Sequence, residues 1–412
     1  MNKVIVIGGG PAGLMAASQA SLRGLDVTLI ERNERCARKL MITGKGRCNI
    51  TNATFDIQDL LSNIPTNPRF LYSAFNSFMT YDTISFFEDL GVQTKIERGN
   101  RVFPVTDKAV TVVDALVGYA KKCGVKIIHG RVVSLDFDDK IKGVSLDDGT
   151  NIECDAVIVA TGGKSYPQTG STGDGYTLAK MAGHTIAPIY PSLVALNAHE
   201  YWCGDLQGLS LKNTAIKLID KKSGKEVYSD FGEMLFTHFG VSGPMILSAS
   251  AHMQKDLKDR YKILIDLKPA LTFEQLDKRV TKDFLENSNK DFINSLSALL
   301  PHKMIPVIVK LSGIQPSAKC NQITKEMRHR LVSLLKGLEI NITSFKGIDE
   351  AIVTSGGVNV KEIDPKTMQS KLVKNLFFAG EVIDVDAYTG GFNLQIAFST
   401  GYLAGIKVLE EN

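Results

Sequence analysis

The sequence lacks any uninterrupted apolar stretch long enough to span a membrane. It also lacks a strong charge of either sign, because 48 lysines and arginines against 44 aspartates and glutamates leave a net charge of +4. So small a bias does not by itself indicate a nucleic-acid partner. Met1 runs directly into a strand-like segment, so no signal or transit peptide is expected. We therefore expect a cytoplasmic protein that binds neither membranes nor nucleic acid.

Cysteine and histidine are few and dispersed. None of the six cysteines forms a Cys-x-x-Cys pair, and the seven histidines show no metal-ligand spacing. This pattern argues against a disulfide framework and against a zinc site, and it favours reduced thiols. We expect a protein without a structural metal.

The chain is nevertheless long and ordinary in composition. Its 412 residues, 44% of them hydrophobic and 22% charged, are typical of a globular protein with two or three domains.

The most informative feature of the chain is a glycine motif near its start. An apolar run, Val4 to Ile7, predicts a buried parallel strand and is followed at once by Gly8-x-Gly10-x-x-Gly13. Gly8 permits a tight turn, Gly10 lets a pyrophosphate approach the backbone, and Gly13 allows close packing of helix and strand. A helix-compatible pattern follows and ends near Gly24.

A second predicted strand ends in Glu31, 18 residues after Gly13. An acid at this distance accepts hydrogen bonds from the adenosine ribose, and an acid in place of an arginine argues against a 2′-phosphate. Because the glycines lie between a strand and a helix and are followed by this acid, the segment predicts a dinucleotide site.

Further glycine clusters follow predicted strands later in the chain. Ligands of open α/β sheets bind beyond the carboxyl ends of the strands, so these clusters are expected to converge on one site. The clusters are Ala160 to Gly163, Ile352 to Val358, and Phe377 to Glu381 with Tyr388 to Gln395.

The pattern of apolar and polar residues changes in the middle of the chain. From Pro191, alternating segments suggest antiparallel strands, and Leu271 to Leu311 is strongly helical. The strand-then-glycine pattern returns near Asn375 and precedes a long final helix. We therefore predict an α/β fold in which a Rossmann-type dinucleotide-binding domain, residues 1–190 and 346–412, is interrupted by an insertion, residues 191–345.

Taken together, several motifs resemble those of the BaiN-like flavoproteins, also called aminoacetone-oxidase-like. They are GGGPAG, the Arg38 to Asn52 segment with RCNITN, ATGG, THFGVSGP, TSGGV and AGEVIDVDAYTGGFNLQ. The resemblance runs through almost the whole chain. It implies FAD as cofactor, a glutathione-reductase-like FAD domain, and an inserted substrate or cap domain made of a β-barrel with a helical subdomain at about 270–330.

The resemblance also implies roles for individual residues around the cofactor. The pyrophosphate would be held by the glycine motif with Pro11 and Ala12, while Glu31 would bind the ribose and Arg32 would lie beside the adenine. The backbone of Val133 would meet the adenine edge. The loop that reaches toward the phosphates and the flavin would contain Arg38, Lys39, Arg47, Cys48 and Asn49. Other contacts would come from Ala160, Thr161, Gly162, Gly380, Glu381, Gly391, Asn393 and Leu394.

No catalytic acid or base is evident from the sequence. Cys48 is a candidate because the charge of Arg47 would lower its pKa, although a small packed residue is the alternative. Tyr388 is a second candidate, as proton donor or as an aromatic wall.

The expected activity is oxidoreduction of a small or medium organic molecule by FAD. Reduction of a conjugated C=C bond with NADH or NADPH is the first expectation, and oxidation of an amine such as aminoacetone is the alternative. A tRNA-modifying flavoprotein and a non-catalytic flavin sensor are further alternatives. The lysines and arginines of the insertion are mixed with acids, which argues against the tRNA alternative.

Overall fold

The computed structural model describes residues 2–254, 257 and 259–410. The chain divides into two compact units, one made of Met1–Ser192 with Ile348–Asn412 and the other of Leu193–Gly347. The domain boundaries expected from the sequence fall two residues earlier at both junctions.

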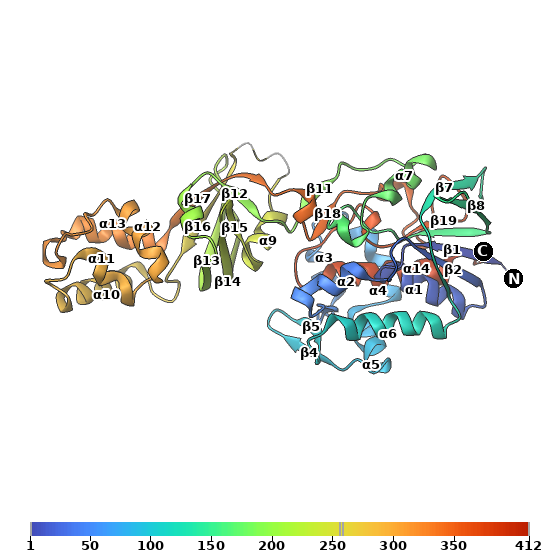
Figure 1. Cartoon of the computed structure of the whole chain (residues 1–412), viewed down its shortest axis with the longest axis horizontal. Helices are drawn as coiled ribbons and strands as arrows, with labels where there is room; N and C mark the ends of the chain where they lie inside the picture. Colours follow the sequence, from blue (N-terminus) through green and yellow to red (C-terminus); the bar gives the residue numbers. More distant parts are fainter. Residues whose placement is uncertain (1, 255–256, 258, 411–412) are drawn as a thin grey trace. The chain divides into compact units, whose positions relative to one another are not determined.

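The first unit is built on a five-stranded sheet whose neighbouring strands all run parallel (Figure 1). The strand order is β19-β10-β1-β2-β6. The strands are β1 (Lys3–Ile7), β2 (Asp26–Glu31), β6 (Lys126–His129), β10 (Ala156–Val159) and β19 (Leu376–Phe378). Apolar β-branched residues dominate β1 and β10, as expected where both faces of a sheet are covered.

Two helices from opposite ends of the chain pack closely in this unit. They are α1 (Pro11–Leu22) and α14 (Phe392–Lys407). Their contact depends on small residues, because a Cβ at Gly401 or Gly405 would overlap the backbone of Ala12 or Ala16. The end of the chain therefore completes the domain that its start begins.

The remaining elements of the first unit surround this core. Its longer helices are α5 (Thr80–Asp89), α6 (Ala109–Lys122) and α7 (Asp174–Met181), with the short α2 (Arg38–Ile42), α3 (Ile57–Ser62) and α4 (Tyr72–Ser77). Small antiparallel sheets are formed by β3 (Thr51–Asn52), β5 (Arg101–Pro104) and β4 (Thr94–Glu97); by β7 (Val132–Phe137), β8 (Ile141–Leu146) and β9 (Asn151–Glu153); and by β11 (Tyr190–Ser192) with β18 (Val353–Ser355).

The second unit contains a closed six-stranded barrel with the order β12-β15-β14-β13-β16-β17. Its strands are β12 (Leu196–Ala198), β13 (Ser210–Asp220), β14 (Glu226–Thr237), β15 (Gly240–Ser242), β16 (Tyr261–Asp266) and β17 (Leu338–Phe345). Alternate residues of β16 are buried, as on a strand with one face toward the barrel core. Figure 1 shows the barrel strands β12 to β16 in green to yellow and β17 in orange.

Between β16 and β17 the chain forms a helical subdomain. Its helices are α10 (Phe273–Glu286), α11 (Phe292–Ser295), α12 (Ile305–Ser312) and α13 (Lys325–Lys336), while α8 (Trp202–Asp205) and α9 (Pro244–Ala251) belong to the barrel segment. The predicted fold class, a Rossmann-type domain interrupted by a barrel with a helical subdomain, is confirmed. None of the helices described is long and apolar enough to cross a bilayer.

Candidate functional site

The glycine motif forms the turn between β1 and α1, and two of its glycines are required by the protein itself. Gly8 has φ of +103°, and a Cβ there would lie 2.6 Å from the carbonyl oxygen of Ala160. A Cβ at Gly13 would overlap the carbonyl oxygen of Gly8. These two glycines let β1, β10 and α1 approach closely.

Gly10 differs, because nothing in the described chain demands a glycine there. Its φ is −79°, an ordinary value, and a Cβ would meet no atom within 4 Å. The open space lies at the first turn of α1, where backbone N–H groups have no intrahelical partner. A pyrophosphate fits both observations, since it needs room beside the backbone and donors at a helix N-terminus.

Glu31 ends β2 beside this turn and is only 8% exposed. One carboxylate oxygen, Oε2, accepts a hydrogen bond from the N–H of Gly9 at 2.7 Å. The other, Oε1, accepts from the N–H and the side-chain amide of Asn33 at 2.8 and 2.6 Å. The acid is therefore fixed next to the glycine turn, and Oε2, with one donor in the protein, has the capacity to accept a further hydrogen bond.

Two buried polar atoms in the predicted cofactor segments have no protein partner in the described chain. They are Oδ1 of Asn49 and Oγ1 of Thr161. Buried polar atoms are rarely left unpaired, so each is an acceptor or donor available to a ligand. Together with the space at Gly10 and the fixed Glu31, these atoms fit FAD.

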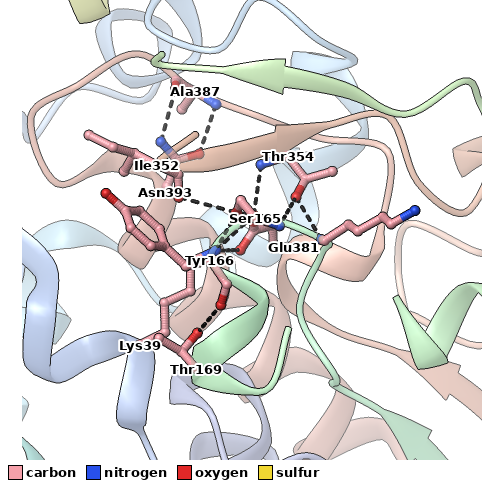
Figure 2. A network of polar contacts seen from close by, with 10 residues as sticks. Lys39, Ser165, Tyr166, Thr169, Ile352, Thr354, Glu381, Ala387 and Asn393 are labelled. Atoms are coloured by element: carbon pink, nitrogen blue, oxygen red, sulfur yellow. Dashed lines mark hydrogen bonds and ion pairs between the residues drawn. The ribbon is translucent and has the colours of Figure 1, made fainter. Parts of the chain in front are cut away.

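The centre of the polar network is an ion pair between Lys39 of α2 and Glu381, which follows β19 (Figure 2). Nζ of Lys39 lies 2.8 Å from Oε2 of Glu381 and 2.7 Å from Oγ of Ser165. Oε1 of Glu381 also accepts from Ser165 at 3.1 Å and from the N–H of Thr354 at 2.8 Å. Glu381 therefore ties together α2, the loop after β10 and β18.

The resemblance implies that Lys39 and Glu381 contact the cofactor; those contacts stay predictions, and the structure shows the contacts of these residues within the protein. Burial by itself would raise the pKa of Glu381, but the charge of Lys39 and the hydrogen bonds outweigh burial and lower it. The carboxylate is ionised and already accepts four hydrogen bonds, so it acts as a clamp within the protein. Lys39 is likewise directed at Glu381 and Ser165 in this structure.

The two most characteristic motifs, RCNITN and YTGGFNLQ, lie against each other although they are far apart in sequence. The side-chain amide of Asn52 donates to the carbonyl of Gly390 at 3.0 Å, and Oγ1 of Thr51 donates to Oε1 of Gln395 at 2.6 Å. Gly391 has φ of +101°, and a Cβ there would overlap the carbonyl of Thr51. The motifs form one structural unit.

Asn393 fixes the loop that precedes α14 (Figure 2). Its Oδ1 accepts from the N–H of Ala387 at 2.9 Å, and its Nδ2 donates to the carbonyls of Ala387 at 2.9 Å and Tyr388 at 3.3 Å. The side chain of Asn393 thus orients the loop, while Leu394 is half-buried on the first turn of α14.

Arg32, Arg38 and Val133 lie at the edge of the first unit. Arg32 binds Thr172 at 2.5 Å and Asp174 at 3.0 Å, and Arg38 donates to Asn33 at 3.2 Å. Val133 lies on β7 with a side chain that is 38% exposed. The predicted contacts of Arg32 and Val133 with the adenine, and of Arg38 with the phosphates and the flavin, stay predictions.

The idea that Arg47 activates Cys48 is wrong. The guanidinium of Arg47 turns away to Glu97 and Asp107 and lies 4.1 Å above the ring of Phe103. Cys48 is fully buried, and burial raises the pKa of its thiol to about 12. A thiol in this state holds its proton at neutral pH and is a poor nucleophile.

We therefore expect Cys48→Ala to keep the rate of flavin reduction and turnover within about twofold, because the thiol contributes packing only. Iodoacetamide at pH 8 should leave Cys48 unmodified in the folded wild type, as peptide mass mapping will show. A loss of activity in Cys48→Ala with unchanged flavin content would restore the catalytic role.

Three residues of this site could not be identified from the sequence. Ser165 and Thr354 bind Glu381, and Gln395 connects Thr51 and Thr83, its Oε1 accepting from both hydroxyls at 2.6 and 2.8 Å. All three lie within or next to the predicted glycine clusters, so their position along the chain was the available signal.

Comparison with known proteins identifies relatives over the whole chain. The family model described as HI0933-like protein Rossmann domain matches residues 2–407. The chain is 33% identical to the 3-dehydro-bile acid delta(4,6)-reductase of Clostridium scindens over 416 residues, which cover 100% of both chains. It is 32% identical to the ribosomal RNA dihydrouridine synthase of Haemophilus influenzae over 411 residues, 98% of each.

A solved structure shows the same fold at low sequence identity. The 3-ketosteroid-delta4-(5alpha)-dehydrogenase of Rhodococcus jostii RHA1 matches with a TM-score of 0.50 and 14% identity, covering 100% of this chain and 97% of that one.

Proposed function

The chain belongs to the HI0933-like family and is an FAD-dependent oxidoreductase, and from this premise we propose that it reduces a carbon–carbon double bond conjugated to a carbonyl group. NADH or NADPH is the proposed electron source. The observation that carries the proposal is the 33% identity to a bile acid reductase over the full length of both chains.

The names of two relatives describe the same class of bond. A 3-dehydro-bile acid with double bonds at positions 4 and 6 carries them in conjugation with its 3-carbonyl. Formation of dihydrouridine saturates the C5=C6 bond of uracil, which is conjugated to the 4-carbonyl. Each reduction adds two electrons and two protons across the bond, and NAD(P)H with one proton supplies them. The two relatives therefore share the class of bond and differ in the molecule that carries it.

FAD, when bound, supplies the two-electron chemistry, and the protein supplies binding, orientation and a proton. We assign the proton donor role to Tyr388, in the loop that Asn393 fixes. Burial, and then the negative charge of Asp386, raise the pKa of Tyr388. The phenol is therefore protonated at neutral pH and can donate to a substrate carbon or oxygen.

A second substrate class is favoured by the relative that acts on ribosomal RNA. At 32% identity it is almost as similar to this chain as the bile acid reductase. A uridine in RNA presents the same conjugated bond, so the two substrates need no difference in chemistry. Amine oxidation of the aminoacetone type stays an alternative that requires electron flow from an amine to the flavin.

Anaerobic stopped-flow absorbance tests the proposal. NADH or NADPH should bleach the flavin of the purified protein, and a 4-en-3-one bile acid or a uridine-containing RNA should restore its colour faster than air does. Aminoacetone should leave the oxidised flavin unchanged. Bleaching by aminoacetone, with no reoxidation by either conjugated substrate, would replace the proposal with amine oxidation.

The Tyr388→Phe variant tests the proton donor. It should be bleached by NAD(P)H at the wild-type rate but reoxidised by the conjugated substrate about 100-fold more slowly. Tyr81→Phe is the matched control, because Tyr81 is an exposed tyrosine of α5 in the same unit. Equal reoxidation rates in both variants would remove Tyr388 from the mechanism.

A further inference from the structure

Positive charge is concentrated in the helical subdomain. Residues 268–337 contain twelve lysines and arginines and six acids, a net charge of +6. The whole chain carries +4, so the rest of the protein is slightly negative. A domain that gathers the excess positive charge of a nearly neutral chain favours a polyanionic partner.

Several acids of this subdomain are held in ion pairs with its own bases. Asp277 pairs with Arg328 at 2.7 Å, and Asp283 pairs with Arg279 at 2.9 Å. Each of these pairs neutralises one base together with one acid, so the net charge of +6 is carried by the remaining bases. The expectation of no nucleic-acid partner was based on the small net charge of the whole chain and on the mixed signs along the insertion, and not on the charge of this subdomain by itself.

An exposed aromatic ring lies next to a lysine of the subdomain, and a second lysine contacts the chain a few residues after that ring. Tyr201 is 71% exposed, and Nζ of Lys310 on α12 lies 4.9 Å from the centre of its ring. Lys303 donates to the carbonyl of Gln207, just after α8. We call Tyr201, Lys303 and Lys310 the Tyr201 surface.

The position of the ring is well defined by its neighbour. Trp202, the next residue and the first of α8, is buried and packs against Phe236 with ring centres 6.1 Å apart. Since Lys310 lies over Tyr201 and most of the ring remains exposed, Tyr201 can still receive a flat partner. The pKa of Lys310 is raised, mainly by its contact with Tyr201 and to a smaller extent by the negative charge of Asp205. The ammonium of Lys310 is therefore charged at neutral pH.

A hollow with a volume of about 410 Å³ adjoins the same lysine. Lys310 forms part of its lining, and the other lining residues are mostly apolar: Ile293, Pro306, Val309, Ile314 and Pro316 among them. An apolar hollow beside a cation suits a planar base attached to a phosphate backbone.

We propose that the Tyr201 surface binds single-stranded RNA. Tyr201 stacks on an unpaired base, Lys303 and Lys310 contact the backbone phosphates, and the net charge of the subdomain attracts the strand. The inference deepens the RNA form of the proposed function, because a uridine must be unpaired before its C5=C6 bond is accessible. Stacking on an exposed ring likewise requires a base that is not held in a duplex.

Fluorescence anisotropy with fluorescein-labelled U20 RNA tests the proposal on the FAD-loaded protein. At 50 mM salt the wild type should bind with a Kd of roughly micromolar order and lose affinity steeply as salt rises. Tyr201→Ala should weaken binding by about 5- to 100-fold, in the range measured for one stacked base. The double variant Lys303→Glu/Lys310→Glu should weaken it more than tenfold and flatten the salt dependence.

Matched controls come from the other unit of the chain. Tyr81→Ala and Lys122→Glu remove an exposed tyrosine and reverse an exposed lysine there, and both should bind U20 as the wild type does. Equal affinity of the Tyr201-surface variants and these controls would overturn the inference, as would wild-type binding of 20-bp duplex DNA as tight as that of U20.

The proposed function is measured separately in the same proteins. Reoxidation by a 4-en-3-one bile acid should be unchanged in the Tyr201 variants, since the altered residues contact RNA only. A wild type that reduces the enone but does not bind U20 would refute the RNA surface and leave the proposed function standing. A wild type that binds U20 but reduces no conjugated bond would support the RNA surface and refute the proposed function.

Discussion

Replacing Gly10 by alanine is expected to yield a folded protein that purifies without its yellow colour. The backbone at Gly10 has an ordinary φ, and a methyl group there meets no atom of the described chain within 4 Å. The methyl would instead occupy the space beside the first turn of α1, where we expect the pyrophosphate to approach the backbone. We expect FAD affinity to fall at least about 100-fold, equivalent to about 2.7 kcal/mol.

FAD is titrated into the apoprotein, and binding is measured by the quenching of flavin fluorescence. The urea midpoint of apo Gly10→Ala should stay close to that of the apo wild type, because Ala at a helix N-cap costs about 1 kcal/mol or less relative to Gly. Gly118→Ala is the matched control: Gly118 lies in α6 with open space around it, and that variant should bind FAD normally. Wild-type FAD affinity in Gly10→Ala would place the pyrophosphate elsewhere.

The second large effect is expected from Lys39→Met, which leaves the carboxylate of Glu381 without its cation. Removal of one partner of a buried ion pair costs about 3–5 kcal/mol. Because about a fifth of each side chain is exposed, 21% for Lys39 and 22% for Glu381, we expect about 2–3 kcal/mol at pH 7.5. The double variant Lys39→Met/Glu381→Gln should recover most of this loss, since no charge then remains unpaired.

The dependence on pH distinguishes an electrostatic loss from a packing loss. In the wild type the pKa of Glu381 is lowered, so its contribution is present above the unfolded pKa of about 4.3 and disappears as pH falls below it. Without Lys39, burial dominates and raises that pKa. The deficit of Lys39→Met should therefore shrink as pH falls from 7.5 toward 5, whereas a deficit that is constant with pH would contradict the ion-pair explanation.

The single tryptophan of the chain provides an internal control for this experiment. Trp202 lies in the inserted unit, so its fluorescence follows the unfolding of that unit only. Far-UV circular dichroism of the flavin-free proteins should show the loss of stability, while the tryptophan transition should keep its midpoint. A shift of both transitions would indicate a general folding defect.

Local patterns were sufficient to predict the part of the site formed by neighbouring residues. The turn after β1 follows from three glycines at fixed spacing, and Glu31 ends β2 within hydrogen-bond distance of the Gly9 N–H. These contacts form inside one strand–helix–strand unit, so spacing and residue type are enough to place them. The barrel and the helical subdomain were predicted from the family resemblance together with the change in residue pattern after Pro191.

Contacts between distant segments could not be predicted in this way. The partner of Lys39 is Glu381, 342 residues later, and Thr51 binds Gln395, 344 residues later. A glycine cluster shows that the backbone is approached closely but does not show what approaches it. The proximity of Arg47 and Cys48 in the sequence was misleading, because the guanidinium of Arg47 pairs with Glu97 and the thiol of Cys48 is buried.

The sequence by itself therefore determined the glycine turn, the helix N-terminus and the acid Glu31 beside them, which we predict to bind the adenosine end of FAD, because these features are adjacent along the chain. Only the tertiary structure decided how the final helix meets the RCNITN loop and which side chains clamp the cofactor loops. It also decided that Lys310 of the insertion lies beside the exposed ring of Tyr201. Those arrangements depend on packing between segments that are far apart in the sequence, and local periodicity does not predict such packing.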